Sequence, residues 1–461
     1  MANLAPLYDL EKTNAFEDAS TTKYERYEVK TNTAEFGLGQ TTNFEIKNND
    51  TDGYYDIGDT QLWLQYQLLN NTSACTNLEQ VHLSNPWMLF DRVTLLLNGV
   101  QIASISDPGI VHTMRMLVEG GKSYSDSVQQ KSHFFPLSKY EDADLGSKVL
   151  GTAASGDATY PTNSWSDRNQ FVVATNEITN IIENPNYDEN FAKQNALSTN
   201  VNNYCLLNLG ELIPYLAQYN RVSRGQVFEL KLTRSSPAKA LFAGIAAPDF
   251  HIKKLSLFMR RVKPSLSKQV VLNSTLSSKA VVPLVYDHVD VHVEHDINKS
   301  TLANRFIIAH RSARVKQILV AFCEARNSES VRRDPLAFRR NKVNSIECRI
   351  NGISFPDQIY RYTDEGSSRI IADIHELGMK NQVWDGDSLI DPVNWETTRC
   401  VYAFDTSRQE ESFDSARNVQ TELRYTLESA ADNNYNVYCI VVSERKASLN
   451  LVDGHTKIYM D

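Results

Sequence analysis

One feature occurs twice in this sequence: an Asn-Gly pair with apolar, strand-like residues on both sides. The first copy is Asp91–Ser104, DRVTLLLNGVQIAS, which contains Asn98-Gly99, and the second is Asn344–Asp357, NSIECRINGISFPD, which contains Asn351-Gly352. Both residues of the tight turn between two antiparallel strands must accept positive φ, and Asn and Gly do so readily. The sequence therefore predicts two β-hairpins, about 250 residues apart.

A second pair of segments follows the hairpins in the same order. Gln226–Ser236 reads QVFELKLTRSS and Val419–Ser429 reads VQTELRYTLES. When these two segments are aligned, four positions match in character: Glu229 with Glu422, Leu230 with Leu423, Lys231 with Arg424 and Thr233 with Thr426. Two sets of landmarks in one order indicate a duplicated β domain.

Strand and helix patterns support the duplication. Thr60–Leu69 alternates apolar and polar residues, as a half-buried strand does, and Val315–Ala325 is its expected counterpart. Helical spacing follows each hairpin, at Ile110–Val118 and again at Arg369–Met379. Each copy thus has about seven or eight short strands and one helix. Short, evenly spaced strands separated by turn signals favour an antiparallel sandwich or jelly roll. The predicted fold class is all-β.

The two copies differ in length. Asn98 and Glu229 lie 131 positions apart, whereas Asn351 and Glu422 lie 71 apart. The first copy therefore carries about 60 additional residues, and we place them in a Ser-, Asp- and Asn-rich stretch at about 122–203. A structureless loop of that length is unusual in a compact domain, so we expect a decorated insertion that projects from one end of the sandwich.

These landmarks divide the chain into five parts. The expected parts are an N-terminal arm (1–35), a first jelly roll with the insertion (36–264), a connector (265–278), a second jelly roll (279–446) and a C-terminal tail (447–461). The arm is polar and mixed in charge, so we expect it to be extended or to be ordered by its neighbours. The arm and the C-terminal tail are both candidates for segments that clasp a neighbouring subunit.

Charge and cysteine content narrow the classes of function. The net charge of −9 does not provide the basic field of a protein that mainly holds nucleic acid. None of the six cysteines forms a Cys-x-x-Cys pair, and buried free thiols are expected. The N-terminal stretch lacks a secretory signal pattern, and no window is apolar enough for a transmembrane helix.

The strongest candidate for a chemical site is the stretch Asp287–Asp296, DHVDVHVEHD. In a strand, His288, Asp290 and His292 share one face, and two imidazoles with one carboxylate could meet a metal ion. The alternative is the polar face of an ordinary half-buried strand, and no metal or other cofactor is predicted. A third possibility is a subunit contact that changes when histidine is protonated.

Two other groups have weaker functional interpretations. A basic cluster (Arg332, Arg333, Arg339, Arg340 and Lys342) could contact packaged DNA or an acidic neighbour, or it could be a solvated loop. Asp385 and Asp387 could imitate a glycosidase carboxylate pair or a calcium loop. Trp384 and Trp395 beside these acids could form a sugar-binding platform, and the favoured alternative is that they anchor the core or a loop. No nucleophile elbow, Walker loop, zinc-protease helix or dinucleotide fingerprint is present, so no enzyme is predicted.

The doubled order of strand, Asn-Gly hairpin and helix resembles the double jelly-roll major capsid proteins of DNA viruses, in particular the Polinton (Maverick), adintovirus and virophage group. Phe250–Val262, FHIKKLSLFMRRV, and the ending at Thr421–Leu451 also carry this resemblance. It implies two jelly rolls side by side, homotrimeric pseudo-hexameric capsomers, an icosahedral shell, and the insertion as part of an outward tower.

The expected function is therefore that of a structural major capsid protein in the virion. Its partners would be itself, neighbouring capsomers and penton or minor capsid proteins, without sequence-specific nucleic-acid binding. It would be made in the host cytoplasm and assembled in the host nucleus or cytoplasm. The alternative is a carbohydrate-binding or carbohydrate-active protein with two β-sandwich domains.

Overall fold

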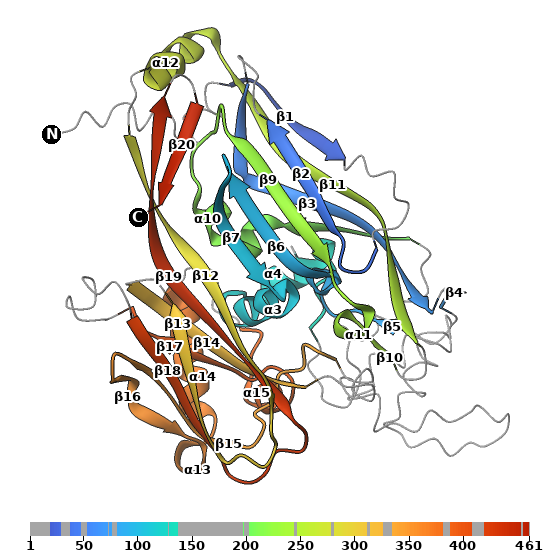
Figure 1. Cartoon of the computed structure of the whole chain (residues 1–461), viewed down its shortest axis with the longest axis vertical. Helices are drawn as coiled ribbons and strands as arrows, with labels where there is room; N and C mark the ends of the chain where they lie inside the picture. Colours follow the sequence, from blue (N-terminus) through green and yellow to red (C-terminus); the bar gives the residue numbers. More distant parts are fainter. Residues whose placement is uncertain are drawn as a thin grey trace.

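The chain folds into two β-sandwiches that lie side by side (Figure 1). This computed structural model describes residues 19–28, 37–47, 53–71, 73–75, 81–127, 129–136, 197, 202–243, 247–277, 281–310, 314–325, 334–380, 388–407, 419–452 and 455–460. We call the sandwich formed by residues 19–264 the first roll and the sandwich formed by residues 281–460 the second roll. The insertion expected at about 122–203 falls mostly outside the described residues.

The first roll consists of two facing sheets of antiparallel strands. One sheet has the order β1-β11-β3, with β8 and β4 also paired to β3, and comprises Ala19–Glu28, Pro248–Pro264, Tyr54–Asn70, Asn203–Asn208 and Ser73–Ala74. The other has the order β2-β9-β6-β7 and comprises Thr41–Lys47, Val227–Arg234, Phe90–Leu97 and Val100–Ser106. A small separate sheet pairs β5 with β10, Val81–His82 with Phe242–Ala243.

The second roll repeats this arrangement. One sheet has the order β12-β19-β14-β17, with β20 also paired to β19, and comprises Val281–Ile297, Tyr435–Val452, Arg314–Glu324, Val401–Asp405 and His455–Met460. The other has the order β13-β18-β15-β16 and comprises Ala303–His310, Val419–Leu427, Val343–Ile350 and Ile353–Arg361.

Both rolls therefore have the eight-stranded jelly-roll topology. If the main strands of each roll are numbered one to eight along the chain, both have sheet orders 1-8-3-6 and 2-7-4-5. Folding a long hairpin over itself produces this order and leaves few unprotected sheet edges. The all-β, tandem jelly-roll fold predicted from the sequence is confirmed.

The repeated Asn-Gly pairs form the predicted turns. Asn98 and Gly99 have φ of 51° and 77°, and Asn351 and Gly352 have φ of 49° and 86°. Both turns join the fourth and fifth strands of their roll, β6 to β7 and β15 to β16. Positive φ at both central residues is the type I′ requirement, which explains why this dipeptide occurs at both positions.

Helices fill the connections between strands. The predicted helices after the two hairpins are α3 (Pro108–Glu119) and α14 (Ser368–Lys380). The remaining helices are η1 (Pro86–Leu89), α4 (Lys122–Ser127), η2 (Gln129–Ser132), α9 (Leu209–Leu212), α10 (Pro214–Gln218), α11 (Pro237–Ala240), α12 (Leu266–Ser277), α13 (Tyr362–Glu365) and α15 (Pro392–Thr397). Among the described residues, no helix combines the length and apolar character needed to cross a membrane.

Two expected boundaries need correction. The segment 1–35 is not only an arm, because Ala19–Glu28 forms β1, the first strand of the first roll, and pairs with β11. The segment 447–461 is not only a tail, because β19 continues to Val452 and β20 pairs with its end. In both places a polar or mixed sequence is held in a sheet by backbone hydrogen bonds to a neighbouring strand.

Candidate functional site

Two of the three residues predicted as a possible metal site, His288 and Asp290 of β12, form a cluster with Arg445 of β19. His288 Nε2 lies 3.1 Å from Asp290 Oδ1, and Arg445 of β19 lies 3.3 Å from the other carboxylate oxygen. Burial alone would raise the pKa of Asp290, but the hydrogen bond from His288 and the charge of Arg445 outweigh it and lower that pKa. A guanidinium already neutralises this carboxylate, so the arrangement does not favour a metal cation.

His292 does not join this cluster. Its Nε2 is buried and has no hydrogen-bond partner among the described residues, and burial lowers the pKa of its imidazole despite the opposing effect of Asp290. In the described part of the chain, no group of three or more His, Cys, Asp or Glu side chains could hold a metal ion. We therefore interpret His288, Asp290 and His292 as structural residues of an edge strand.

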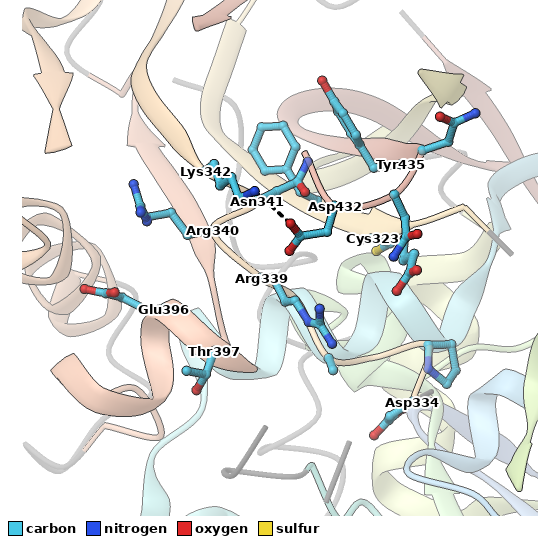
Figure 2. Close-up of a pocket in the computed structure, with 16 residues that line it drawn as sticks. Cys323, Asp334, Arg339, Arg340, Asn341, Lys342, Glu396, Thr397, Asp432 and Tyr435 are labelled. Carbon is cyan, nitrogen blue, oxygen red and sulfur yellow. Dashed lines mark hydrogen bonds and ion pairs between the residues drawn. The ribbon is translucent and has the colours of Figure 1, made fainter. Parts of the chain in front are cut away.

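Two residues of the basic cluster, Arg340 and Lys342, are bound to acidic partners of their own roll. Arg340 lies 2.7 Å from Glu428 and 3.7 Å from the centroid of the Tyr362 ring, and Lys342 lies 2.7 Å from Asp432. Arg340, Lys342 and Asp432 line a cavity of about 250 Å³ beside Tyr435 (Figure 2). Arg332 and Arg333 lie outside the described residues. Arg340 and Lys342 thus stabilise the loops around this cavity.

Trp395, which could have formed part of a sugar platform, is in the core, as the favoured alternative has it. Trp395 has no exposed surface, packs edge-on against Tyr402 at 5.4 Å, and donates from Nε1 to the carbonyl of Val401 at 3.2 Å. A sugar-binding platform needs an exposed ring face, so Trp395 cannot contribute one. Trp384, Asp385 and Asp387 lie outside the described residues.

The contact region between the two rolls, which we call the seam, joins them through carboxylates. Four of the hydrogen bonds that cross it end on carboxylates, and each roll contributes two donors and two acceptors to these four. The donors and acceptors are Ser84 to Asp334 (2.5 Å), Gln218 to Asp287 (2.7 Å), Gln317 to Glu119 (2.8 Å) and Tyr438 to Asp107 (3.3 Å). Three of the four are buried, and the one from Gln218 is exposed. Hydrogen bonds to charged acceptors are stronger than neutral ones, so they fix the relative position of the rolls.

Aromatic packing reinforces the seam. Tyr215 of α10 in the first roll meets Tyr286 of β12 in the second roll edge to face, with ring centroids 4.8 Å apart. Both rings are almost completely buried, and burial raises the pKa of both hydroxyl groups. Edge-to-face aromatic pairs add about 0.5–1.5 kcal/mol beyond the burial of their surface.

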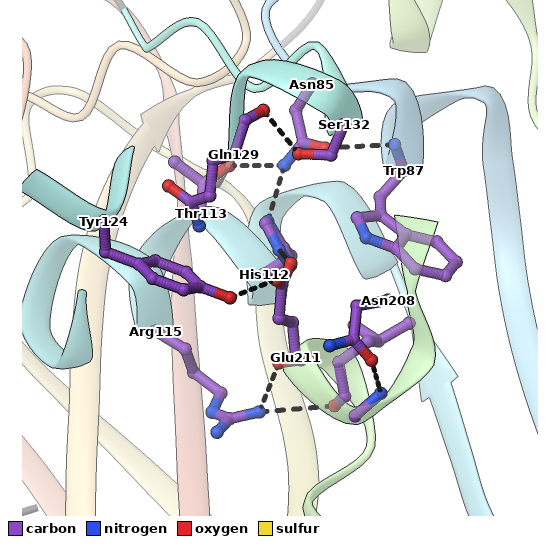
Figure 3. A network of polar contacts seen from close by, with 12 residues as sticks. Asn85, Trp87, His112, Thr113, Arg115, Tyr124, Gln129, Ser132, Asn208 and Glu211 are labelled. Carbon is purple, nitrogen blue, oxygen red and sulfur yellow. Dashed lines mark hydrogen bonds and ion pairs between the residues drawn. The ribbon is translucent and has the colours of Figure 1, made fainter. Parts of the chain in front are cut away.

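A buried polar network supports the seam from within the first roll (Figure 3). The Asn85 side-chain oxygen accepts from the backbone N–H of Trp87, which turns its amide nitrogen toward His112 Nδ1 at 3.1 Å. Nδ1 is therefore an acceptor, and the proton is on Nε2, which donates to Glu211 at 3.2 Å. The network fixes the tautomer of His112 and connects α3 to η1 and α9.

Arg115 extends the network to the seam itself. Its guanidinium pairs with Glu119 at 2.6 Å and donates to the Glu211 carbonyl at 2.8 Å. Glu119 in turn accepts the hydrogen bond from Gln317 of the second roll. Arg115 and Glu119 have only about a tenth of their side-chain surface exposed, so breaking this pair would leave a buried charge uncompensated.

A cleft of about 1010 Å³ opens along one side of the seam. Asp107 and Lys239 line it from the first roll, and His295 and Lys299 line it from the second. Lys239 pairs with both Asp107 and Asp91. Burial alone would lower the pKa of Lys239, but the two carboxylates outweigh burial and raise that pKa above its ordinary value. Lys239 thus holds the entry of α3 in place, since Asp107 immediately precedes that helix.

Sequence reasoning did not identify the seam, although one signal was present. The strand β3 alternates, and Leu62, Leu64, Tyr66 and Leu68 are buried between its half-buried neighbours. Its counterpart β14 instead has the continuous apolar run Ile318–Cys323, which is buried throughout. A continuous apolar run is typical of a strand covered on both faces. The continuous run in β14 therefore indicates that the first roll covers this sheet of the second roll.

The fold and the seam define a class: proteins built from two jelly rolls of the same topology that are joined by a buried contact. In sequence, residues 157–447 match the model of the double jelly roll-like domain. The chain therefore belongs to the double jelly roll-like domain family. No curated protein matches the sequence.

Solved structures share the fold at low sequence identity. A chain in the cryo-EM structure of the Sputnik virophage matches with a TM-score of 0.62 and 9% identity, covering 96% of this chain and 89% of that one. A chain in the quasi-atomic model of the PBCV-1 virus capsid matches with a TM-score of 0.50 and 9% identity, covering 96% and 97%. The mavirus major capsid protein matches with a TM-score of 0.47 and 10% identity, covering 95% and 90%.

Proposed function

We propose that this chain is the major capsid protein of a DNA virus or virus-like element of the Polinton, adintovirus or virophage type. Three copies form a pseudo-hexameric capsomer, and capsomers assemble with penton and minor capsid proteins into an icosahedral shell. The protein acts in the virion as a structural subunit without catalysis. It is made in the host cytoplasm and assembles in the host cytoplasm or nucleus.

The observation that carries this proposal is the duplicated sheet order within one rigid chain. Two jelly rolls of the same topology, joined by a buried seam, make one chain equivalent to two neighbouring positions of a six-membered ring. Three such chains then complete the ring with one kind of contact repeated. The likeness in fold to a chain of a virus capsid supports the same conclusion.

Burial of apolar surface would stabilise the capsid at two levels, within each sandwich and between chains. Inward-facing residues such as Leu64 and Phe322 stabilise each sandwich by about 1.5–3 kcal/mol per buried side chain. Contacts between chains then cover surfaces that a single chain leaves exposed, and weaker polar contacts between trimers permit closure of a shell. The acidic net charge of −9 suits a shell whose genome is condensed by other components.

Light scattering during size-exclusion chromatography tests the proposal. The purified full chain should elute as one species at about three times 52.2 kDa. Negative-stain images of that species should show hexagonal outlines with a three-fold axis. A species that stays at one copy over the full range of soluble concentrations would overturn the proposal.

A further inference from the structure

The equivalent strands of the two rolls differ in burial on one face. In β3 of the first roll, Gln61, Trp63 and Gln65 are half-buried between fully buried neighbours. In β14 of the second roll, every residue from Gln317 to Cys323 is buried. Since the strands occupy the same place in the same topology, the second roll has a cover on its sheet that the described residues do not provide for the first roll.

The cover comes from the helices of the first roll. Glu119 at the end of α3 accepts from Gln317 of β14, and Tyr215 and Gln218 of α10 contact Tyr286 and Asp287 of β12. Figure 1 shows α3 and α10 on the side of the first roll that is turned toward the second. The seam is thus a contact between the helical side of one roll and the outer sheet face of the next.

The equivalent helices show the complementary difference. All residues of α3 are buried, because it lies between the two rolls. Its counterpart α14 buries Ile370, Ile371, Ile374, Leu377 and Gly378, and leaves its other side exposed. On that side Met379 is 57% exposed, beside Ala372 and Glu376. The helical side of the second roll therefore lacks the sheet that covers the helical side of the first.

In the part of the chain that the structure describes, one surface of each kind is therefore left without a covering element. We call the outward residues Gln61, Trp63, Gln65 and Tyr204 the sheet face, and the residues Ala372, Glu376 and Met379 of α14 the helix face. We propose that the helix face of one copy docks on the sheet face of a second copy of this chain, repeating the seam between molecules. This inference rests on the proposed function and specifies its interface.

The sheet face carries a suitable anchor. Trp63 stacks on Tyr204 with ring centroids 5.8 Å apart, and the Arg26 guanidinium lies 4.8 Å from the Trp63 ring centroid. Tyr204 is 51% exposed although it is a large aromatic residue on a strand. Trp, Tyr and Arg are the residues that most often dominate binding energy at interfaces. The two faces differ from each other, so the contact is head-to-tail and cannot give a symmetric dimer; three copies complete a ring when the rotation between them closes.

Charge substitutions on the two faces provide the first test. Tyr204→Arg and Met379→Arg each place a charge on an exposed position of one face, and each should convert the three-copy species into a one-copy species. Ile307→Arg is the matched control, because Ile307 is 52% exposed on β13, outside both faces, and it should leave the mass unchanged. Circular dichroism melts of all three variants monitor folding.

Mixing the variants tests the head-to-tail geometry. Tyr204→Arg retains an intact helix face and Met379→Arg retains an intact sheet face, so an equimolar mixture should form a two-copy species that cannot close. A three-copy species that both variants leave intact would overturn this inference while the proposed trimer stands. A wild-type chain that never forms three copies would instead overturn the proposed function.

A measurement on the wild-type chain avoids any effect of substitution on folding. Hydroxyl radicals oxidise exposed Trp, Tyr and Met side chains, and these are the three residue types that anchor the two faces. Trp63, Tyr204 and Met379 should be oxidised several-fold more slowly in the three-copy species than after its dissociation by dilution. Equal oxidation in the two states at all three residues would also overturn the inference.

Discussion

The side-chain oxygen of Asn98 accepts a hydrogen bond from the backbone N–H of Val227 at 2.7 Å, and the Asn98 N–H donates to the Val227 carbonyl at 2.8 Å. Asn351 and Gln420 repeat this pair in the second roll, at 3.0 Å and 2.9 Å. The turn residue thus also holds the start of the seventh main strand of its roll, β9 or β18. This second role explains why the dipeptide uses Asn and not Gly at its first position.

The two hydrogen bonds between Asn98 and Val227 lead to a prediction for the first roll. Asn98→Ala should lower the free energy of unfolding by about 1–2 kcal/mol, because it removes the hydrogen bond and places a Cβ-bearing residue without a local polar group at positive φ. Asn98→Asp is the matched control, since its carboxylate accepts the same hydrogen bond and Asp tolerates this φ. Urea unfolding curves measure both. Equal stabilities of the two variants would show that Val227 does not depend on the side chain.

The duplication could be predicted because its signals are local. An Asn-Gly turn and an alternating strand are set by neighbouring residues, and the alignment of Glu229 with Glu422 matches the pairing in the structure. Val227 and Gln420 lie opposite Asn98 and Asn351, two positions before those glutamates. The sequence alignment is therefore also a structural alignment of the two rolls.

Other parts could not be predicted because their causes are not local. The strand β1 has the sequence ASTTKYERYE, which lacks apolar alternation, and it is a strand because β11 offers its backbone groups for pairing. The seam depends on how two finished rolls meet, which no single segment specifies. His288, Asp290 and His292 attracted attention by residue type, but Arg445, a neighbour 155 positions away from Asp290, decides the character of that cluster.

The basic cluster supports a second prediction. Arg340→Ala should lower the free energy of unfolding by about 2 kcal/mol, because Arg340 donates to Glu428 and lies over the Tyr362 ring. Arg340→Lys is the control that keeps the charge and loses the planar contacts, and it should recover only part of the loss. Thermal melts followed by circular dichroism measure both. If Arg340→Ala were as stable as wild type but bound duplex DNA more weakly, the DNA-contact interpretation would replace ours.

The seam supports a third prediction. Glu119→Ala should destabilise the chain by about 3 kcal/mol, because it leaves the buried Arg115 guanidinium without its carboxylate. Gln317→Ala removes only the hydrogen bond across the seam and should cost about 1.5 kcal/mol. Urea unfolding measures both variants and the double variant. The two changes should not be additive, because they share one carboxylate.

Glu45→Ala is the comparison for the seam variants. Glu45 pairs with Lys47 at 2.8 Å, and about half of the surface of each side chain is exposed. Exposed ion pairs contribute at most about 1 kcal/mol, so this variant should be close to wild type. A loss for Glu119→Ala no larger than the loss for Glu45→Ala would contradict the structural importance that we assign to the buried pair.

His133 supports a prediction about pH. Burial lowers the pKa of its imidazole from 6.5 to about 4, and Tyr66 OH lies 3.0 Å from its Nδ1. The folded state therefore holds a neutral imidazole between pH 4 and 6.5, where the unfolded state binds a proton. Stability from this group is complete above pH 6.5 and is lost as the pH falls toward 4, with a slope of at most about 1.4 kcal/mol per pH unit.

His133→Asn isolates this contribution. His133 has φ of 54°, and Asn is the residue other than Gly that best tolerates this conformation, so the variant should fold without backbone strain. Urea unfolding at pH 7 and pH 5 should show a smaller loss of stability for the variant than for wild type. Carboxylates that titrate in the same range act equally on both proteins and cancel in the difference. An identical loss in both proteins would show that His133 is protonated without cost in the folded state.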